Sequence, residues 1–218
     1  MIVSEKLEQG SDAWFKIRQG RPTASEFSRI ITAKTGAPSA SREDYIDELI
    51  AESYIPEQDA VENSWVFTGQ KFIGNKFTDH GNDFEPEARE AFAKEMETEV
   101  AEVGFITRDD GIVGCSPDGL LADEAGDWWA GVEIKCKCLK NHIKAKRTGA
   151  LPDEHKAQVH GSMAVTGLRV WFFVSYFPGR PVHIVRVEWD SYTDKVSAAL
   201  DQFLIDYAAR READFKTK

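Results

Sequence analysis

Apolar and charged residues alternate along residues 132–138, and this period of two predicts a β-strand. Its apolar side chains would enter the core, whereas Glu133, Lys135 and Lys137 would share the opposite face. Upstream, a Pro-Asp-Gly turn signal places Asp118 where one strand ends and the next begins. The strand and the turn therefore present carboxylates and an ammonium group close together.

The rest of the chain alternates between helical and strand patterns. Apolar spacing and cap residues predict helices over 12–19, from 23 onward, and over 42–54, 83–96 (with Met96 in its buried stripe), 153–165 and 191–215. Period-two segments predict two strand pairs, 100–108 with 112–115 and 169–177 with 182–189. Between the first pair and the central strand, residues 123–130, which contain Trp128 and Trp129, are expected to form a loop. We expect an α/β fold, with residues 1–218 as a single domain, in which helices flank a mixed central β-sheet of about five strands.

Polar residues gather at two predicted helix starts. Ser11 is placed to cap the first helix, and Thr23 with Glu26 forms a capping box for the second. Ser25 then lies in a first turn, where free backbone amides attract anions, and Arg18 is close to it in sequence. Taken alone, these two residues are an ordinary helix-start serine and a surface cation.

The charge is unevenly distributed along the chain. The net charge is −10, yet residues 135–147 contain lysines and an arginine and no acidic residue. Most acidic residues lie elsewhere, at 43–62 and 79–102. A basic patch on an acidic body is compatible with a protein that holds nucleic acid at one place and repels it elsewhere.

The three cysteines, Cys115, Cys136 and Cys138, lie in predicted apolar strands. We expect them to be small buried residues in a reducing compartment, without disulfides. A zinc or iron–sulfur site would need a further ligand and other spacings, and the spacing of His155 and His160 does not suit one helical face. The chain has no signal peptide and no apolar run of membrane-spanning length, so we expect a cytoplasmic protein without membrane contact.

The residues around Asp118 suit metal-assisted phosphodiester hydrolysis. Asp118, Glu133 and the backbone carbonyl of Ile134 would supply hard oxygen ligands for Mg²⁺, for which Mn²⁺ would substitute. The cation would lower the pKa of one water, and Lys135 would orient that water. A motif this short also arises by chance, in which case Asp118 is only a turn residue and Glu133 and Lys135 lie on a solvated strand face.

Further motifs favour the functional interpretation. The sequences SPDG at 116–119 and EIKC at 133–136 resemble the P-D…(D/E)-x-K nuclease superfamily, in particular the lambda-type phage alkaline exonucleases and related viral recombinases. The similarity runs from about residue 9 to the strand at 171 and includes these matches: Asp12-Ala13-Trp14 with Arg18, Thr23-Ala24-Ser25-Glu26, Phe84-Glu85 with Ala88-Arg89, and Ala157-Gln158-Val159 with Ser162-Met163.

This resemblance implies a restriction-endonuclease-like nuclease core and a Mg²⁺-dependent 5′→3′ exonuclease acting on double-stranded DNA ends. The enzyme would digest the 5′-phosphorylated strand to mononucleotides and leave a 3′ overhang for a single-strand annealing protein. Such recombination serves phages, so the gene would belong to a phage or prophage in a bacterial host. The family also implies a processive homotrimeric ring, to which a monomer with a solvated basic patch is the alternative.

The resemblance also assigns roles to individual residues. The catalytic and metal-binding groups would be Asp118, Glu133, the Ile134 carbonyl, Lys135 and Glu85. A pocket for the terminal 5′-phosphate would be formed by Arg18, Ser25, Ser116 and Gln158. His155 stands where the family pattern has a tyrosine, so its role is open.

Other functions fit parts of the pattern. An endonuclease or repair nuclease of the same superfamily would use the same carboxylates without preferring 5′-phosphorylated linear duplex over circles. A non-catalytic DNA-end clamp would bind ends and give no metal-dependent product, although Asp118, Glu133 and Lys135 together argue against it. Trp128 and Trp129 would either stack on bases or pack on a neighbouring subunit or loop.

Overall fold

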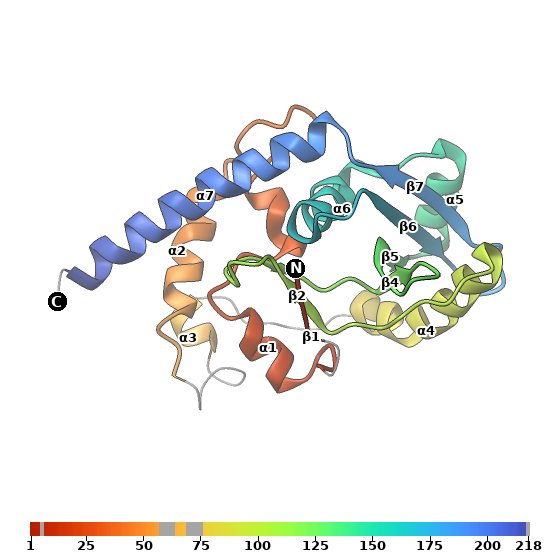
Figure 1. Ribbon diagram of the computed structural model, residues 1–218, viewed down its shortest axis with the longest axis horizontal. Coiled ribbons are helices and arrows are strands. Elements are labelled where there is room, and N and C mark those ends of the chain that lie inside the picture. Colours follow the sequence, from red (N-terminus) through yellow and green to blue (C-terminus); the bar gives the residue numbers. More distant parts are fainter. Residues whose placement is uncertain (5–6, 57–63, 69–75, 217–218) are drawn as a thin grey trace.

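The computed structural model describes residues 1–4, 7–56, 64–68 and 76–216, and only the backbone of 64–65 and 76–82 (Figure 1). Its α-helices are α1 (Asp12–Arg18), α2 (Arg42–Glu52), α3 (Ser64–Thr68), α4 (Lys76–Met96), α5 (Leu139–Thr148), α6 (Asp153–Thr166) and α7 (Ser191–Lys216), and Ala24–Arg29 form a 3₁₀ helix, η1. Its strands are β1 (Ile2–Ser4), β2 (Phe105–Thr107), β3 (Gly114–Cys115), β4 (Gly119–Ala122), β5 (Trp128–Cys136), β6 (Val170–Tyr176) and β7 (His183–Glu188). No described helix has the length and apolar character needed to cross a membrane.

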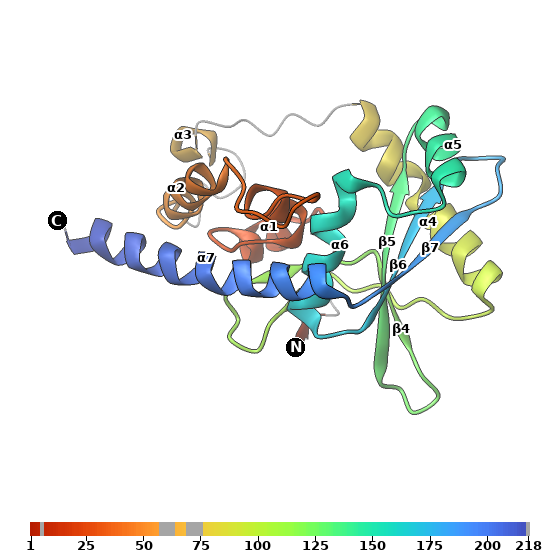
Figure 2. The same cartoon turned by 90° about the horizontal axis from the view of Figure 1, so that it is seen from above.

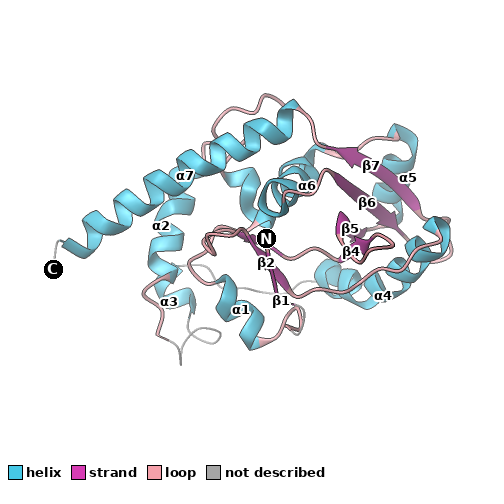
Figure 3. Ribbon diagram, in the orientation of Figure 1, coloured by secondary structure: helices cyan, strands magenta, loops and turns pink. Residues whose placement is uncertain are grey.

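The strands form two sheets. The larger is mixed, with the order β4-β5-β6-β7, in which only β5 and β6 run parallel, joined through α5 and α6. The smaller sheet, β1-β2-β3, is antiparallel. Pro117, which has no N–H to donate to a ladder, stands between β3 and β4, where the chain passes from one sheet to the other. The expected α/β fold, with a mixed sheet flanked by helices, is confirmed (Figure 3).

Helices cover both faces of the mixed sheet, as Figure 2 shows from above. On one face, α4 packs through Phe92 against Phe172, in a cluster that also holds Val132 and other apolar residues of β5. On the other face, Trp171 and Phe173 join the cluster to which α6, η1, α2 and α7 contribute. Because side chains alternate along a strand, Glu133 points away from the α4 face and towards α6.

A glycine lets α6 approach η1 closely. A Cβ built on Gly161 would lie 2.2 Å from Cδ2 of Phe27, well inside contact distance. Phe27 is almost fully buried in the same cluster. Because residue 161 has no side chain, η1, which carries Ser25, can pack this close to α6.

Several local expectations were wrong. Thr23 does not cap a regular α-helix, because the segment forms η1 and the Thr23 hydroxyl accepts a bond from Arg18 instead. Trp128 begins β5 rather than lying in a loop, since it pairs with Ala122 across the ladder. Met96 is 37% exposed because α4 ends there. Cys138, unlike Cys115 and Cys136, is only partly buried, beyond the end of β5.

The packing around Trp128 and Trp129 also bears on their role. Trp128 packs against the large cluster, and the Trp129 ring meets Phe172 edge to face at 5.9 Å between centroids. Both rings are therefore partly buried within this chain. Their contacts are those of packing residues, not of exposed platforms for bases.

Candidate active site

Glu133 and Lys135 lie on the same face of β5, as the alternation predicts. Glu133 is 1% exposed, and its Oε1 lies 2.5 Å from Nζ of Lys135 and accepts a 2.6 Å hydrogen bond from Nε2 of Gln158. Its Oε2 is buried and has no hydrogen-bond partner among the described residues. Burial raises the pKa of Glu133 to about 7; Lys135 opposes this shift and Asp118 adds to it.

Asp118 is fastened to β5 by two hydrogen bonds. Its backbone N–H donates to the Val132 carbonyl at 3.0 Å, and its Oδ2 accepts from the Ile134 N–H at 2.5 Å. These bonds continue the ladder in which Gly119 pairs with Val132. Burial raises the pKa of Asp118, against the opposing effects of Lys135 and the Ile134 amide. The turn thus holds this carboxylate beside the strand that carries Glu133.

Glu85 reaches the same centre from α4. Burial raises the pKa of Glu85 to about 7, helped by the charge of Asp118 and opposed by Arg89. Arg89, one helical turn further along, donates from Nη2 to Glu85 Oε1 at 2.6 Å and from Nε to the Asp118 carbonyl at 2.9 Å. Its third nitrogen, Nη1, lies 2.9 Å from Glu102. Arg89 therefore ties α4 to the turn that carries Asp118.

This arrangement has the chemistry of a divalent-cation site. No three acidic, His or Cys side chains of the described residues are close enough to enclose an ion by themselves. However, the orphan Oε2 of Glu133 and the shared negative charge of Glu133, Asp118 and Glu85 suit a hard cation that takes few protein oxygens and keeps several waters. Asp118, Glu133 and the Ile134 carbonyl would hold it, with Glu85 as a further ligand.

A second polar cluster surrounds Arg18. Nη1 of Arg18 donates to Ser116 Oγ at 3.2 Å, and Nη2 donates to Ser25 Oγ at 3.1 Å and to Thr23 Oγ1 at 3.3 Å. The guanidinium lies 4.1 Å from the centre of the Trp14 ring, and Trp14 Nε1 donates to Ser116 Oγ at 2.9 Å. Arg18 has a lowered pKa because it is buried, with no carboxylate in direct contact among the described residues. A cation whose described neighbours are hydroxyls and an aromatic ring, with no carboxylate, is suited to an anionic ligand.

The structure therefore brings together three of the four residues expected in a phosphate pocket, namely Arg18, Ser25 and Ser116. Gln158 donates to Glu133 instead. Burial raises the pKa of the Cys115 thiol; the charge of Glu133 adds to the shift, and the charge of Arg18 opposes it. Glu133 of the first cluster and Arg18 of the second thus both act on this thiol.

His155 does not join either cluster. Its ring stacks on Phe173 at 5.3 Å between centroids, and Nε2 lies 3.2 Å from the Glu154 carboxylate. Burial lowers the pKa of His155 to about 3, and the charges of Lys135 and Lys137 lower it further. The imidazole is therefore neutral at physiological pH.

Three residues in these clusters received no functional role from the sequence, although the motif matches contain all three. Arg89 follows Glu85 by one helical turn, and Trp14 precedes Arg18 by the same interval, so helical spacing could have assigned each a role beside its partner. Thr23 was assigned to a helix cap. Its bond to Arg18 depends on how separate segments pack, which spacing does not reveal.

Comparison with known proteins identifies the family of this chain. Residues 13–169, more than half of the chain, match the YqaJ-like viral recombinase domain. The chain belongs to this family. Membership confirms the resemblance to lambda-type phage exonucleases that the motifs indicated. No curated protein gives a significant match.

Solved structures of relatives agree with this assignment. The alkaline exonuclease LHK-Exo from Laribacter hongkongensis is 30% identical, with a TM-score of 0.70, over 95% of this chain and 100% of that one. Its complex with dAMP gives the same identity and coverage, with a TM-score of 0.69. A phage-related exonuclease from Haemophilus somnus 129PT, 13% identical over 94% of this chain and 99% of its own, shares the fold with a TM-score of 0.58.

We expect Arg89 to position Glu85 and Asp118 in this YqaJ-like domain. Arg89→Gln should lower kcat for DNA digestion by roughly 10- to 100-fold, the usual effect of losing a residue that orients metal ligands or catalytic groups, with little change in DNA affinity. Arg89→Lys should recover only part of the loss, because an ammonium cannot make three bonds in one plane. Lys94→Gln, on the same helix, is the control. A loss of DNA affinity in Arg89→Gln as large as its loss in kcat would contradict a positioning role.

Proposed function

We propose that this YqaJ-like protein is a Mg²⁺-dependent 5′→3′ exonuclease that digests the 5′-phosphorylated strand of duplex DNA ends. The observation that carries the proposal is the spacing of Ser116 and Asp118. Ser116 belongs to the polar cluster around Arg18 (the Arg18 cluster), and Asp118 belongs with Glu133, Glu85 and Lys135 to the carboxylate centre. Because these two residues are two positions apart, their Cα atoms are at most roughly 7 Å apart. This spacing suits a terminal 5′-phosphate bound next to the phosphodiester that is cleaved, which releases mononucleotides.

The carboxylate centre supplies the groups that this hydrolysis needs. Bound Mg²⁺ would acidify a water and offset the charge that develops on phosphorus. Gln158 and Lys135 both engage Oε1 of Glu133, which leaves Oε2 for the cation. Burial disfavours a charged Lys135, but Glu133 and Asp118 outweigh it and raise its pKa, so Lys135 stays protonated. It therefore orients water and phosphate as a cation and does not act as the base.

The Arg18 cluster would receive the 5′-phosphate. Arg18 offers charge and two directed N–H groups, and the hydroxyls of Ser25 and Ser116 supply further donors to a dianion. Gln158 has a second amide N–H besides the one given to Glu133, and we assign that N–H to the same phosphate. Phosphate would replace the bonds that Arg18 now makes to the hydroxyls.

The charge of the protein favours an enclosed substrate. A body with a net charge of −10 repels DNA, and its few phosphate contacts weaken as salt rises. We propose a homotrimeric ring closed by heterologous contacts, in which topology prevents dissociation and makes digestion processive. The 3′ overhang that remains would be passed to a single-strand annealing protein in phage-type recombination.

The proposed activity is tested with 5′-phosphorylated linear duplex and closed circular duplex, each with Mg²⁺ or with a chelator. We expect nucleotides from the linear duplex with Mg²⁺ only, and a loss on the order of 10³-fold in Asp118→Asn, Glu133→Gln and Lys135→Ala. Added Mg²⁺ should raise the Tm of the wild type more than that of Glu133→Gln, which tests binding without turnover. Digestion of circles at the same rate would refute an exonuclease.

Arg18→Gln is expected to act on end recognition. It should reduce digestion of 5′-phosphorylated duplex by roughly 10- to 100-fold and digestion of 5′-hydroxyl duplex much less, because charge-assisted bonds to the phosphate are lost. Arg169→Gln, exposed near Trp189, is the matched control. A parallel loss on both substrates would exclude the phosphate role.

The ring predicts a mass of three chains by light scattering and long digestion tracts in the presence of a DNA trap. Topological closure should make tract length insensitive to salt once digestion has begun, whereas initial binding weakens with salt. A stable monomer that releases its substrate after a few nucleotides would rule out the ring.

A further inference from the structure

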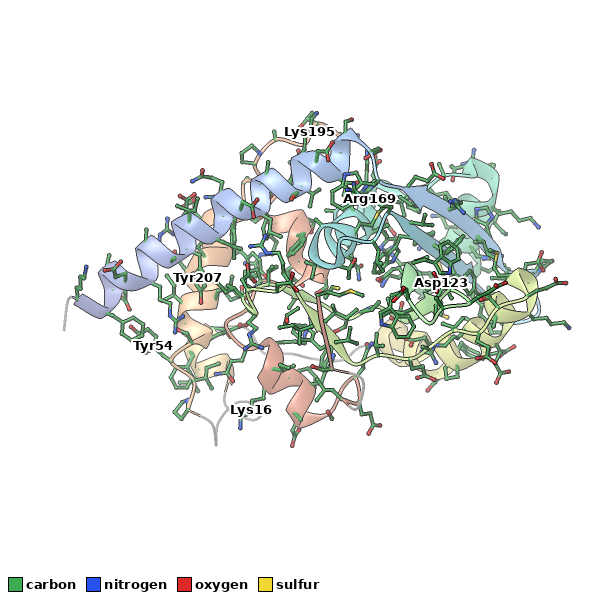
Figure 4. The ribbon with its side chains drawn as sticks, viewed as in Figure 1. Lys16, Tyr54, Asp123, Arg169, Lys195 and Tyr207 are labelled. Carbon is green, nitrogen blue, oxygen red and sulfur yellow. The ribbon has the colours of Figure 1, made fainter. Side chains whose placement is uncertain are left out.

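A cavity of about 510 Å³ lies outside the carboxylate centre, where α1, the end of α2, the β2–β3 turn and α7 meet. Figure 4 labels two of its lining residues, Lys16 on α1 and Tyr207 on α7. Its full lining in the described part of the chain is Lys16, Gln19, Gly20, Arg21, Ser53, Ile55, Gly111, Ile112, Tyr207 and Arg211. Three of these residues are cationic and none is acidic.

Hydrogen bonds hold the walls of this cavity in place. The Tyr207 hydroxyl donates to the Gly20 carbonyl at 3.0 Å, and Nε2 of Gln19 donates to the carbonyls of Glu52 at 2.8 Å and Ile55 at 3.0 Å. Nη1 of Arg21 donates to the Ile17 carbonyl at 2.8 Å, which fixes the guanidinium at the rim. The cavity is therefore built by directed contacts between three helices or their ends.

The arginines of this cavity differ from their neighbours in their partners. Arg210 pairs with Asp47 at 2.9 Å, and Arg29 pairs with Asp44 and Glu48. By contrast, none of the ion pairs between described residues involves Arg21 or Arg211, and the nearby Glu52 carboxylate accepts the Gly20 N–H at 2.8 Å. Asp109 and Asp110 in the adjacent turn are engaged by the N-terminal amine and by Arg108.

We propose that this cavity binds a phosphodiester of the DNA backbone, away from the scissile bond. The argument rests on the proposed function, because a DNA substrate supplies such a phosphate. Gln19, Gly20 and Arg21 line the cavity and are the three residues after Arg18, so the cavity adjoins the Arg18 cluster along one short segment. The digested strand runs from Arg18 towards Asp118, so the phosphates that reach this segment are those of the complementary strand at the same duplex end, where Arg21 and Arg211 offer charge without an ion-pair partner among the described residues.

The test measures binding of a 5′-phosphorylated duplex in chelator, without turnover, from about 50 to 200 mM salt. Arg211→Gln and the double variant Arg21→Gln/Arg211→Gln are compared with Arg180→Gln, an exposed arginine in the β6–β7 turn. Each lost phosphate contact should reduce the slope of log Kobs against log salt by about 0.9. Arg211 is exposed, so its single variant remains informative if the double variant does not fold.

The outcomes separate this inference from the proposed function. A wild type that binds no duplex would refute the DNA substrate itself. Normal wild-type binding with unchanged slopes in both cavity variants would overturn the phosphodiester site. If the cavity variants bind added dAMP more weakly than the wild type while the duplex slope is unchanged, the cavity binds a free nucleotide and the proposal is overturned. If instead light scattering shows a changed oligomeric mass while the slope is unchanged, the cavity contacts a second copy of the chain and the proposal is again overturned. A shallower slope of log Kobs against log salt in the two cavity variants, but not in Arg180→Gln, supports the proposal.

Discussion

Glu133 is an acidic residue on a buried strand, and the surrounding elements are arranged to make that burial possible. Taking a carboxylate out of water costs several kcal/mol unless partners compensate, and removing one partner of a buried pair costs about 3–5 kcal/mol. Lys135 on the same strand and Gln158 on α6 supply that compensation through one oxygen. The parallel connection from β5 to β6 carries α6 over this face of the sheet, so the topology itself delivers Gln158.

The second oxygen of Glu133 has no hydrogen-bond partner in the described part of the chain, and the neighbouring acids make the charge of Glu133 costly. This excess of negative charge is confined to the surroundings of Glu133. Next to α4, Arg89 bonds to Glu85 and to the Asp118 carbonyl at once, whereas Arg18 bonds to hydroxyls and lies over the Trp14 ring. Lys135 and Arg89 therefore offset only part of the negative charge, while Arg18 has no carboxylate partner among the described residues; we propose that a cation binds at the first place and a phosphoryl group at the second.

The central strand and the turn could be predicted from the sequence because neighbouring residues alone determine them. Alternation places Glu133 and Lys135 on one face whatever packs against it, and Pro-Asp-Gly favours a turn in almost any context. The partners of Arg89 and Thr23 could not be found in this way, because their bonds join segments far apart in sequence or compete with a local cap. The structure places Arg18, Ser25 and Ser116 in contact, as the motif resemblance implied, but the resemblance could not show that the amide of Gln158 faces Glu133.

Gly161 shows how a position without any functional group can be as constrained as a catalytic one. Its missing side chain makes room for Phe27, whose ring lies where a Cβ would be. Phe27 and Ser25 belong to the same short helix, so any displacement of the ring moves a hydroxyl of the Arg18 cluster with it. Residues 27 and 161 are therefore sterically coupled, so a side chain at residue 161 fits only if the residue at 27 is smaller.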